Sequence, residues 1–382
     1  MTPQRPISVA FVNENTLGHV SYLPRFVDEL RRRPELGIRP LPFDVTPLPP
    51  ELARRADLTI RGLRRFGLDF HVARWRKIVS AHAAEQLDAL RRDHRLHAVV
   101  VNTQSVALNL AAVATKLPLF VCLDATFEQL QRSRWFAPNT LARWLTPFTL
   151  APILPLERDL FATCAKLLPW SAPVRDSLVA EYRIAPERIA ILPPSLDLSR
   201  FRRVPRPPHA RPQVLFLGGD FVRKGGPVLL EAYRRHLSHH CDLHIVTQSA
   251  VEPCPGVQIH RHISAGSPAW LERWNQADVF VFPSGLETFG IVLLEALAFE
   301  VPVVASTAGA ACDILENGRT GVLLRDLSPS AIAEGIRQTL DQPEAARERA
   351  RLGRERVERD FELGRNTERL AEMLRMAASP TP

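Results

Sequence analysis

Residues 282–324 read FPSGLETFGIVLLEALAFEVPVVASTAGAACDILENGRTGVLL, and this stretch decides the fold that the second half of the chain is expected to adopt. An apolar run over residues 278–282 leads into it, a loop containing glycine follows, and an almost entirely apolar segment precedes the strand-like residues 302–305. Strand, loop, helix and strand in this order are typical of a parallel α/β sheet. A helix that is apolar on every side is expected to be buried in such a fold.

Two carboxylates stand in this loop and helix. Glu295 shares one helical stripe with Ile291 and Phe299, so the sequence predicts a buried acid that needs hydrogen-bonding partners. Glu287 lies just outside the helix if Thr288 is the N-cap, as the preceding loop indicates. The structural alternatives are a Glu287 that only complements the helix dipole and a Glu295 paired with an arginine or with backbone amides.

The start of the same helix is expected to attract an anion. The N–H groups of Phe289, Gly290 and Ile291 have no partner within the helix, and the helix dipole favours negative charge there. Glycine at position 290 lets a ligand approach the backbone. Amides between two carboxylates suit a ligand with both phosphate and several hydroxyl groups, and a nucleotide sugar is such a ligand.

Residues 282–324 resemble the donor-site region of the retaining glycosyltransferases of group 1, or family 4, whose fold contains two Rossmann-like domains. The family's motif of two glutamates separated by seven residues matches Glu287 and Glu295. The resemblance implies that Glu287 contacts the hydroxyls of the donor sugar and that Glu295 contacts the nucleotide ribose. It also implies that Thr288 and the amides of Phe289 and Gly290 belong to the donor site.

A second candidate site is the sequence GGDFVRKGG at residues 218–226, between an apolar strand at 213–217 and a helix expected from about residue 227. Glycines allow close approach of a phosphate, and two adjacent cations can neutralise a diphosphate. The chain has only four lysines against 45 arginines, so Lys224 is an unusual residue for a merely solvated turn. The resemblance implies that Arg223 and Lys224 contact the donor diphosphate, with Gly219 beside them. The alternative is an exposed basic turn.

Composition limits the protein class and its compartment. A chain of 382 residues with 46% apolar and 24% charged residues is typical of a globular protein with two domains. Its five cysteines are scattered, odd in number and without metal-ligand spacing, which predicts a reducing compartment and no metal. No signal peptide or membrane span is expected, and the cytoplasm is the predicted location.

The net charge of +8 lies entirely in the first half of the chain. Residues 1–200 contain 27 Lys and Arg against 19 Asp and Glu, whereas residues 201–382 contain 22 of each. A basic half indicates an anionic partner, and no nucleic-acid motif is present. Residues 58–79 and 135–148 mix arginine with large apolar residues, which favours an anionic membrane surface as partner, at the inner face of the membrane. The alternative is that these are solvated helices packed on a sheet.

The expected fold class is α/β, with two doubly wound Rossmann-like domains facing a central cleft, the glycosyltransferase B fold. Strands are predicted at residues 7–12, 98–102, 118–123, 166–168 and 189–192, and then at 213–217, 243–247, 257–260, 278–282, 302–305 and 321–324. The predicted parts are an acceptor domain at 1–197, a Pro-rich linker at 198–212, a donor domain at 213–360, and a C-terminal helix at 361–382 that crosses back to the first domain. Residues 189–197 and Phe201 resemble the family's linker signature.

The acceptor side departs from the family at two places. Gly18 is the only glycine kept from the Gly-rich loop that relatives carry after the first strand, where it would lie near the donor phosphate, and His19 follows it. His19 is expected either to face the reacting sugar or to be an exposed histidine in a helical turn. Asp124 stands where many relatives have a histidine, and a carboxylate cannot act as an imidazole does. It could bind sugar hydroxyls, stabilise positive charge at the anomeric carbon or act as a base, or it could only cap the turn near Thr126.

These residues predict an enzyme that moves a sugar from a nucleoside diphosphate sugar to a hydroxyl of a glycan or a lipid-linked acceptor. Asp124, Glu287 and His19 are the candidate catalytic residues, no metal or further cofactor is expected, and retention of anomeric configuration is implied by the resemblance. The sequence leaves two other functions open. One is a sugar-nucleotide epimerase or a phosphorylase on the same scaffold, although no lysine site for pyridoxal phosphate is evident. The other is a non-catalytic protein that binds nucleotide sugars.

Overall fold

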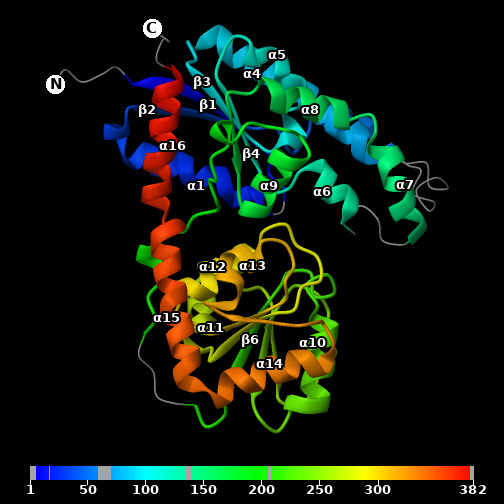
Figure 1. The fold of residues 1–382 in the computed structure, drawn as a ribbon, viewed down its shortest axis with the longest axis vertical. Coiled ribbons are helices and arrows are strands. Elements are labelled where there is room, and N and C mark those ends of the chain that lie inside the picture. Colours follow the sequence, from blue (N-terminus) through cyan, green and yellow to red (C-terminus); the bar gives the residue numbers. More distant parts are fainter. Residues whose placement is uncertain (1–5, 17, 59–69, 134–139, 205–208, 379–382) are drawn as a thin grey trace. The chain divides into compact units, whose positions relative to one another are not determined.

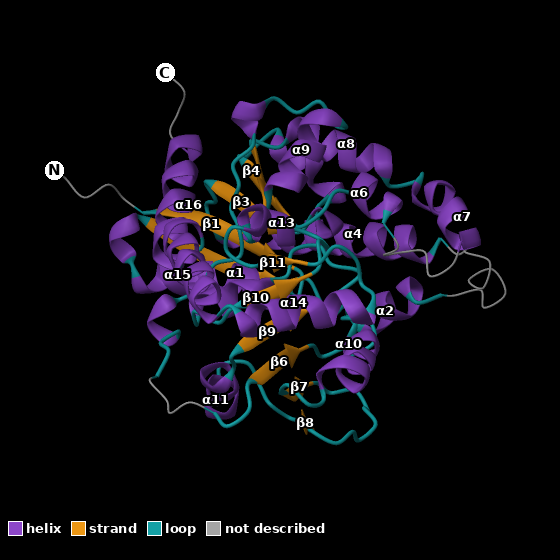
Figure 2. Ribbon diagram, turned by 60° about the horizontal axis from the view of Figure 1, so that its bottom comes forward, coloured by secondary structure: helices purple, strands orange, loops and turns teal. Residues whose placement is uncertain are grey.

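The computed structural model of the chain describes residues 6–16, 18–58, 70–133, 140–204 and 209–378, and it divides into two compact units (Figure 1). Unit 1 comprises residues 1–195 and 363–382, and unit 2 comprises residues 196–362. Each unit has its own parallel sheet covered by helices, as Figure 2 shows by its orange strands and purple helices. The predicted fold class, two doubly wound α/β domains, is therefore confirmed.

Unit 1 contains a five-stranded sheet in the order β2-β1-β3-β4-β5. Its strands are β1 (Ile7–Asn13), β2 (Ile38–Asp44), β3 (Ala98–Asn102), β4 (Leu119–Leu123) and β5 (Lys166–Pro169). All of their pairings are parallel. β3 and β4 consist of fully buried residues, because helices cover both faces of a parallel sheet.

The described α-helices of unit 1 pack on the sheet or on one another. They are α1 (His19–Arg32), α2 (Pro50–Ala56), α4 (His71–Asp93), α5 (Ala111–Ala114), α6 (Phe127–Arg132), α7 (Thr140–Leu150), α8 (Leu154–Thr163), α9 (Ala172–Ala180) and α16 (Leu363–Ala378). In α1, Tyr22, Phe26 and Leu30 recur on one face and are buried. The last helix, α16, packs against α1 within unit 1.

Unit 2 contains a six-stranded sheet in the order β11-β10-β9-β6-β7-β8, again with parallel pairings. The strands are β6 (Gln213–Leu217), β7 (Asp242–Val246), β8 (Val257–His260), β9 (Val279–Phe282), β10 (Val303–Ala305) and β11 (Val322–Leu323). The α-helices are α10 (Gly226–Ala232), α11 (Pro268–Gln276), α12 (Ile291–Ala298), α13 (Ala311–Ile314), α14 (Pro329–Asp341) and α15 (Pro343–Asp360). Valines and phenylalanines of β6 and β9 form much of the core.

Two predictions about strands are wrong. The strand expected at residues 189–192 is only an isolated bridge between Leu167 and Ile189. β2, which contains Pro40 and Pro42, was not predicted to be a strand. Proline cannot donate to a sheet, but β2 is an edge strand of this one, where the missing N–H groups are tolerated.

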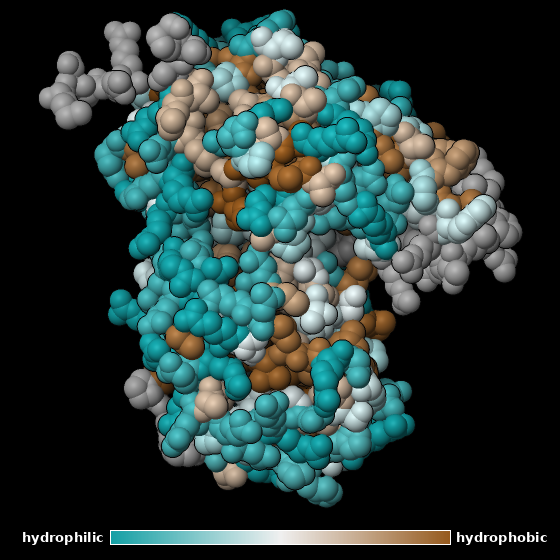
Figure 3. All heavy atoms as spheres, in the orientation of Figure 1, coloured by the Kyte–Doolittle hydropathy of each residue, from teal (hydrophilic) through white to brown (hydrophobic). Residues whose placement is uncertain are grey.

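The apolar and basic segments proposed to meet a membrane are only partly described. Leu63, Phe66, Trp135 and Phe136 lie outside the described residues. On α7, Trp144 and Phe148 are exposed, while the visible face of the protein in Figure 3 is largely hydrophilic with scattered apolar patches. Among the described helices, none has the length and apolar composition needed to cross a bilayer. Binding to an anionic membrane surface stays a prediction.

Candidate functional site

In unit 2 the chain changes direction across the sheet between β6 and β9. The chain moves outward from β6 to β7 and β8 and then returns to place β9 on the other side of β6. In sheets of this kind, ligands bind beyond the carboxyl ends of the strands at such a switch point. The loop after β6 contains Arg223 and Lys224, and the loop after β9 contains Glu287. The topology therefore brings the two predicted halves of the donor site to one edge of the sheet.

The Glu287 carboxylate joins the two loops. Lys224 Nζ donates to Glu287 Oε1, and Arg223 Nη1 lies 3.6 Å from the same oxygen. The Ser284 hydroxyl also donates to this oxygen, at 3.1 Å. The Glu287 side chain is only 8% exposed, so its charge depends on these partners rather than on water. Three of the predicted site residues are thus in direct contact.

The loop after β6 can approach the loop after β9 because of a glycine. Gly225 has a φ of +80°, and a Cβ built there would lie 2.0 Å from the carbonyl oxygen of Pro283. Gly219 differs, since a Cβ there would meet nothing within 4 Å. The Gly219 carbonyl accepts from Thr247 Oγ1 and Ser249 Oγ, both at 3.2 Å. Gly225 therefore allows the two loops to pack closely, whereas Gly219 leaves open space beside the backbone. The contact of Gly219 with the donor stays a prediction.

A buried pair of serines supports Glu287, and the sequence analysis missed it. Ser306 Oγ donates to the backbone oxygen of Ser284 at 2.6 Å, and Ser284 in turn donates to Glu287. Gly309, with a φ of +61°, brings the loop after β10 against the backbone of Glu287, since a Cβ there would lie 2.9 Å from the Glu287 oxygen. The available signal was a serine within two residues of the end of each of two buried apolar strands.

The helix after this loop begins later than predicted. α12 starts at Ile291, and its N-cap is Gly290 in the left-handed conformation, with φ 96° and ψ 57°, so the prediction that Thr288 is the N-cap is wrong. Glycine adopts this conformation readily, and the chain turns there rather than at Thr288. Phe289 is buried, with its ring centroid 6.4 Å from that of Phe361. Phe289 therefore anchors the turn from which the amide at the helix start is presented.

Glu295 is less buried than predicted. It is half-buried, as are Ile291 and Val292, whereas Leu294 and Ala296 are buried. α12 packs on α15 and β10 by its other sides, which leaves one partly open stripe that contains Glu295. The prediction of an acid sealed inside the helix is wrong, because packing on the strand and helix covers only part of the apolar surface. A partly open stripe remains compatible with a contact to ligand.

In unit 1 the corresponding switch point lies between β1 and β3. Gly18 and His19 follow β1, and His19 is the first residue of α1. Gly18 has φ −65° and ψ −17°, an ordinary right-handed conformation, so the backbone itself does not require glycine there. The predicted proximity of Gly18 to the donor phosphate stays a prediction.

His19 and Asp124 form a pair, which the sequence analysis did not predict. His19 Nε2 lies 3.3 Å from Asp124 Oδ2, and His19 Nδ1 lies 3.2 Å from Asn102 Oδ1. The ring centroid of Trp170 is 4.8 Å from that of His19. Both side chains of the pair are less than one-fifth exposed, so the alternative of an exposed histidine is wrong. The next turn is capped by Thr126 itself, through a capping box with Gln129.

Charge around His19 favours its protonated form. Burial lowers the pKa of His19, but the negative charges of Asp124 and Glu14 and the hydrogen bonds to Asp124 and Asn102 raise it more, so the net pKa is raised. Arg76 on α4 faces Asp124 and Glu14 as well. Unit 1 therefore presents a carboxylate paired with a basic group at the carboxyl end of its sheet.

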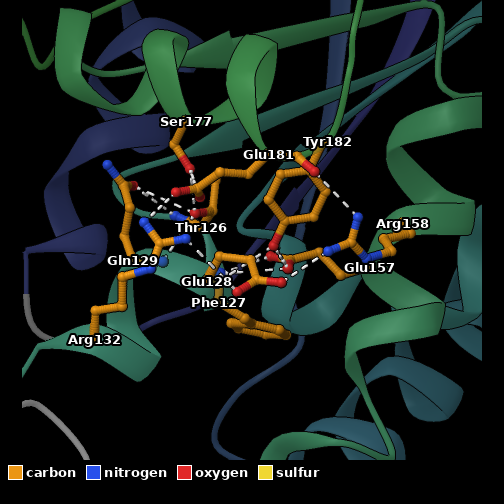
Figure 4. Close-up of polar contacts among 10 residues, drawn as sticks. All are labelled: Thr126, Phe127, Glu128, Gln129, Arg132, Glu157, Arg158, Ser177, Glu181 and Tyr182. Carbon is orange, nitrogen blue, oxygen red and sulfur yellow. Dashed lines mark hydrogen bonds and ion pairs between the residues drawn. The ribbon is translucent and has the colours of Figure 1, made fainter. Parts of the chain in front are cut away.

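The turn after Asp124 is held by a buried glutamate that the sequence analysis also missed (Figure 4). Glu157 Oε1, on α8, accepts from the backbone N–H of Phe127 at 3.0 Å and from Gln104 Nε2 at 3.3 Å. The Tyr182 hydroxyl contacts its second carboxylate oxygen. Burial raises the pKa of Glu157 to about 7, and the hydrogen bonds from Tyr182, Phe127 and Gln104 only partly oppose this rise.

Unit 1 is expected to lose stability as Glu157 ionises. The pKa of Glu157 in the folded chain, about 7, exceeds the usual value of 4.5. The stability that protonated Glu157 contributes is therefore complete below pH 4.5 and is lost as the pH rises through about 7. The loss is on the order of 3 kcal/mol, at about 1.4 kcal/mol per pKa unit. Glu157→Gln keeps a neutral group, so protection of the amides of residues 119–132 from hydrogen exchange should fall less steeply than in the wild type between about pH 5 and 8. Glu187→Gln, at an exposed site, should retain the wild-type slope, and an equal slope in both variants would contradict the assignment.

No group of three or more histidine, cysteine, aspartate or glutamate side chains within the described ranges is placed to hold a metal ion. Metal independence itself stays a prediction. Each unit thus has a candidate site of its own: a carboxylate with two cations in unit 2, and a carboxylate with a histidine in unit 1.

One segment of the chain matches a known protein family. Residues 211–342 match the model for Glycosyl transferases group 1. D-inositol 3-phosphate glycosyltransferase 1 of Catenulispora acidiphila is 30% identical over 217 residues, which cover 49% of this chain and 51% of that protein. The chain thus matches curated relatives of this kind over about half their length.

Solved structures share the fold of the whole chain. Sucrose-phosphate synthase from Thermosynechococcus elongatus superposes with a TM-score of 0.72 at 18% identity, over 98% of this chain and 100% of that chain. HepE from Anabaena, in complex with UDP and glucose, gives 0.64 at 15% identity, over 97% and 100% of the two chains. At these identities the likeness concerns the fold. Residues 211–342 are therefore similar to the group 1 glycosyltransferases, and the chain has the two-domain glycosyltransferase B fold.

Proposed function

We propose that this protein is a retaining glycosyltransferase that moves a hexose-type sugar from a nucleoside diphosphate sugar to a hydroxyl group of a glycan or lipid-linked acceptor. The observation that most supports the proposal is the contact of Arg223, Lys224 and Glu287 at the switch point of unit 2. Two cations and a carboxylate match a ligand that carries both a diphosphate and hydroxyl groups. The family match over residues 211–342 includes all three residues.

Donor binding changes the partners of these groups. The diphosphate accepts hydrogen bonds from Arg223 and Lys224 and competes with Glu287 for them, so the Glu287 carboxylate becomes available to the sugar hydroxyls. When the bond between the anomeric carbon and the diphosphate oxygen breaks, negative charge develops on the leaving diphosphate. The two cations and the amides near Gly290 stabilise that charge. Unit 1 supplies the acceptor site, in which Asp124 and His19 lie.

The proposal is tested by a screen for donor binding followed by a transfer assay. Thermal unfolding is measured with uridine, guanosine and adenosine diphosphates and their sugars, because a ligand that binds the native state raises the unfolding temperature. Donors that stabilise the chain are then incubated with glycan and lipid-linked acceptors, and the anomeric configuration of the product is read by NMR. No stabilisation by any nucleotide would overturn the proposal. Binding without transfer over a broad acceptor panel would favour a non-catalytic protein, and an inverted product would refute retention.

Glu295 is expected to bind the nucleotide ribose. Glu295→Ala should weaken nucleotide binding by about 1–3 kcal/mol, the cost of leaving a ribose hydroxyl without its partner. Isothermal titration of the wild type and the variant with the diphosphate from the screen measures this loss. Glu300→Ala is a matched control, since Glu300 follows α12 and is exposed. Equal affinities of wild type and Glu295→Ala would remove Glu295 from the ribose site.

A further inference from the structure

Polar residues end three adjacent strands of unit 1 and form a row across the sheet. Asn13 at the end of β1 is in register with Asp44 at the end of β2 and with Asn102 at the end of β3. Residues in register on neighbouring strands point to the same face, so their side chains can meet. Asn13 Nδ2 lies 3.2 Å from Asp44 Oδ1, Asn102 Nδ2 lies 3.1 Å from Asn13 Oδ1, and Asn102 Oδ1 lies 3.2 Å from His19 Nδ1.

The direction of hydrogen bonding along this row is determined by Asp44. An ionised carboxylate can only accept, so Asn13 must present its amide nitrogen to Asp44. The side-chain oxygen of Asn15, 2.6 Å from Asn13 Nδ2, favours the same orientation. The Asn13 oxygen then faces Asn102, which must present its own nitrogen and turn its oxygen toward His19. His19 Nδ1 therefore has to carry a hydrogen.

The other side of the ring meets a second carboxylate. His19 Nε2 lies 3.3 Å from Asp124 Oδ2, and an ionised Asp124 can only accept. A histidine that donates from both nitrogens is an imidazolium cation. The charged groups facing the ring are Asp124 after β4 and Glu14 after β1, and Trp170 after β5 contributes its uncharged ring.

We propose that Asp44, Asn13 and Asn102 form a hydrogen-bond relay that holds His19 as an imidazolium, and that His19 in turn positions Asp124 as an ionised carboxylate for the acceptor. Both ring nitrogens of His19 are committed to protein acceptors, so His19 does not act as the base that receives the acceptor proton. Asn13 and Asn102 are positioning residues, because they act through His19. The protonation of His19 stands on the geometry of unit 1 alone, whereas the role of Asp124 rests on the proposed function.

The relay predicts a direction for the pH dependence. The raised pKa of His19 means that the imidazolium is fully present below the ordinary value of 6.5 and is lost as the pH rises through the folded value. The rate of sugar transfer should therefore fall on the alkaline side of its pH profile as His19 loses its proton. Weakening the relay should shift this decrease in rate to lower pH.

The protonation state is measured directly by NMR of the imidazole nitrogens in the full-length chain. The signals of His19 are assigned by their loss in His19→Gln. In the wild type at about pH 7 both nitrogens should be protonated. Asn102→Leu, which removes the acceptor at Nδ1, should lower the proton affinity of His19 at least about tenfold, a change of one pKa unit. Asn102→Asp, which places a carboxylate there, should raise it.

Two further variants separate an effect of the relay from a general effect on folding. Asp44→Asn changes an exposed residue at the sheet edge, so the fold is expected to survive; it removes the obligatory acceptor and should also lower the proton affinity of His19. Asn109→Ala changes an exposed asparagine of the same unit and should leave His19 unaltered. A single neutral tautomer of His19 in the wild type at about pH 7, or an unchanged affinity in Asp44→Asn and Asn102→Leu, would overturn the relay. An imidazolium in a chain without transfer activity would refute the proposed function and leave the relay intact.

Discussion

Replacing Arg223 and Lys224 together by methionine is expected to lower kcat/KM for the donor by about a hundredfold to ten-thousandfold. Each hydrogen bond to a charged group is worth roughly 1.5–3 kcal/mol, so losing two removes about 3–6 kcal/mol, at about 1.4 kcal/mol per factor of ten. Transfer kinetics with the donor found by the thermal screen measure the loss. The effect should fall on donor binding and on the breaking of the glycosidic bond, because both place negative charge beside these cations.

The controls for this double variant separate charge from folding. Removing both cations leaves Glu287 buried without its ionic partners, so a triple variant with Glu287→Gln should restore thermal stability without restoring activity. Replacing Arg234 and Arg235 by methionine removes two exposed cations from the π-helix Tyr233–Leu237 that follows α10 in the same unit. That control should keep wild-type kinetics. An equal loss in the control, or a full rate in the double variant, would refute the diphosphate role.

Gly225→Ala is expected to destabilise unit 2 by about 2–5 kcal/mol. The left-handed backbone conformation costs a residue with a Cβ about 1–2 kcal/mol, and overpacking against the Pro283 carbonyl adds about 1–3 kcal/mol. At roughly 2–4 °C per kcal/mol for a domain of this size, the unfolding temperature should fall by about 4–20 °C. Donor binding should weaken as well, because the loop carrying Arg223 and Lys224 would move away from Glu287.

Gly219→Ala is the matched control for this stability measurement. A Cβ at Gly219 meets nothing within 4 Å, so its unfolding temperature should stay within about 2 °C of wild type, as is usual for a surface substitution. Differential scanning calorimetry of the two variants provides the comparison. Equal unfolding temperatures for Gly225→Ala and Gly219→Ala would mean that the close approach to Pro283 does not hold the two loops together.

Local sequence patterns were sufficient to predict the order of strands and helices and the residues of the candidate donor site. Short apolar runs such as residues 98–102 and 213–217 became central strands, because a parallel sheet covered on both faces buries all or most residues of such a strand. Arg223, Lys224 and Glu287 lie in the loops that follow such strands, so their place at the carboxyl edge of the sheet could be predicted from the sequence. The strand β2 could not be predicted, because it contains prolines and only a position at the edge of the sheet tolerates them.

The acceptor side could not be predicted in the same way. His19, Asn102 and Asp124 are separated by up to 105 positions in the chain, and their contacts depend on strand order and register. The same holds for Glu157, whose carboxylate meets Phe127 and Gln104 only after α8 has packed on the sheet. Glu295 was predicted to be sealed because its neighbours along the helix are apolar, but only packing decides which side of α12 remains open.

The amino-acid sequence by itself determined the class of fold, the alternation of strands and helices, and the family that residues 211–342 resemble, because these depend on hydrophobic period and on motifs confined to a few consecutive residues. Only the tertiary structure decided which polar groups meet, where α12 begins, how far Glu295 is covered and that His19 pairs with Asp124. These depend on distances between segments remote in the chain, and such distances are set by sheet order, register and packing rather than by any local pattern.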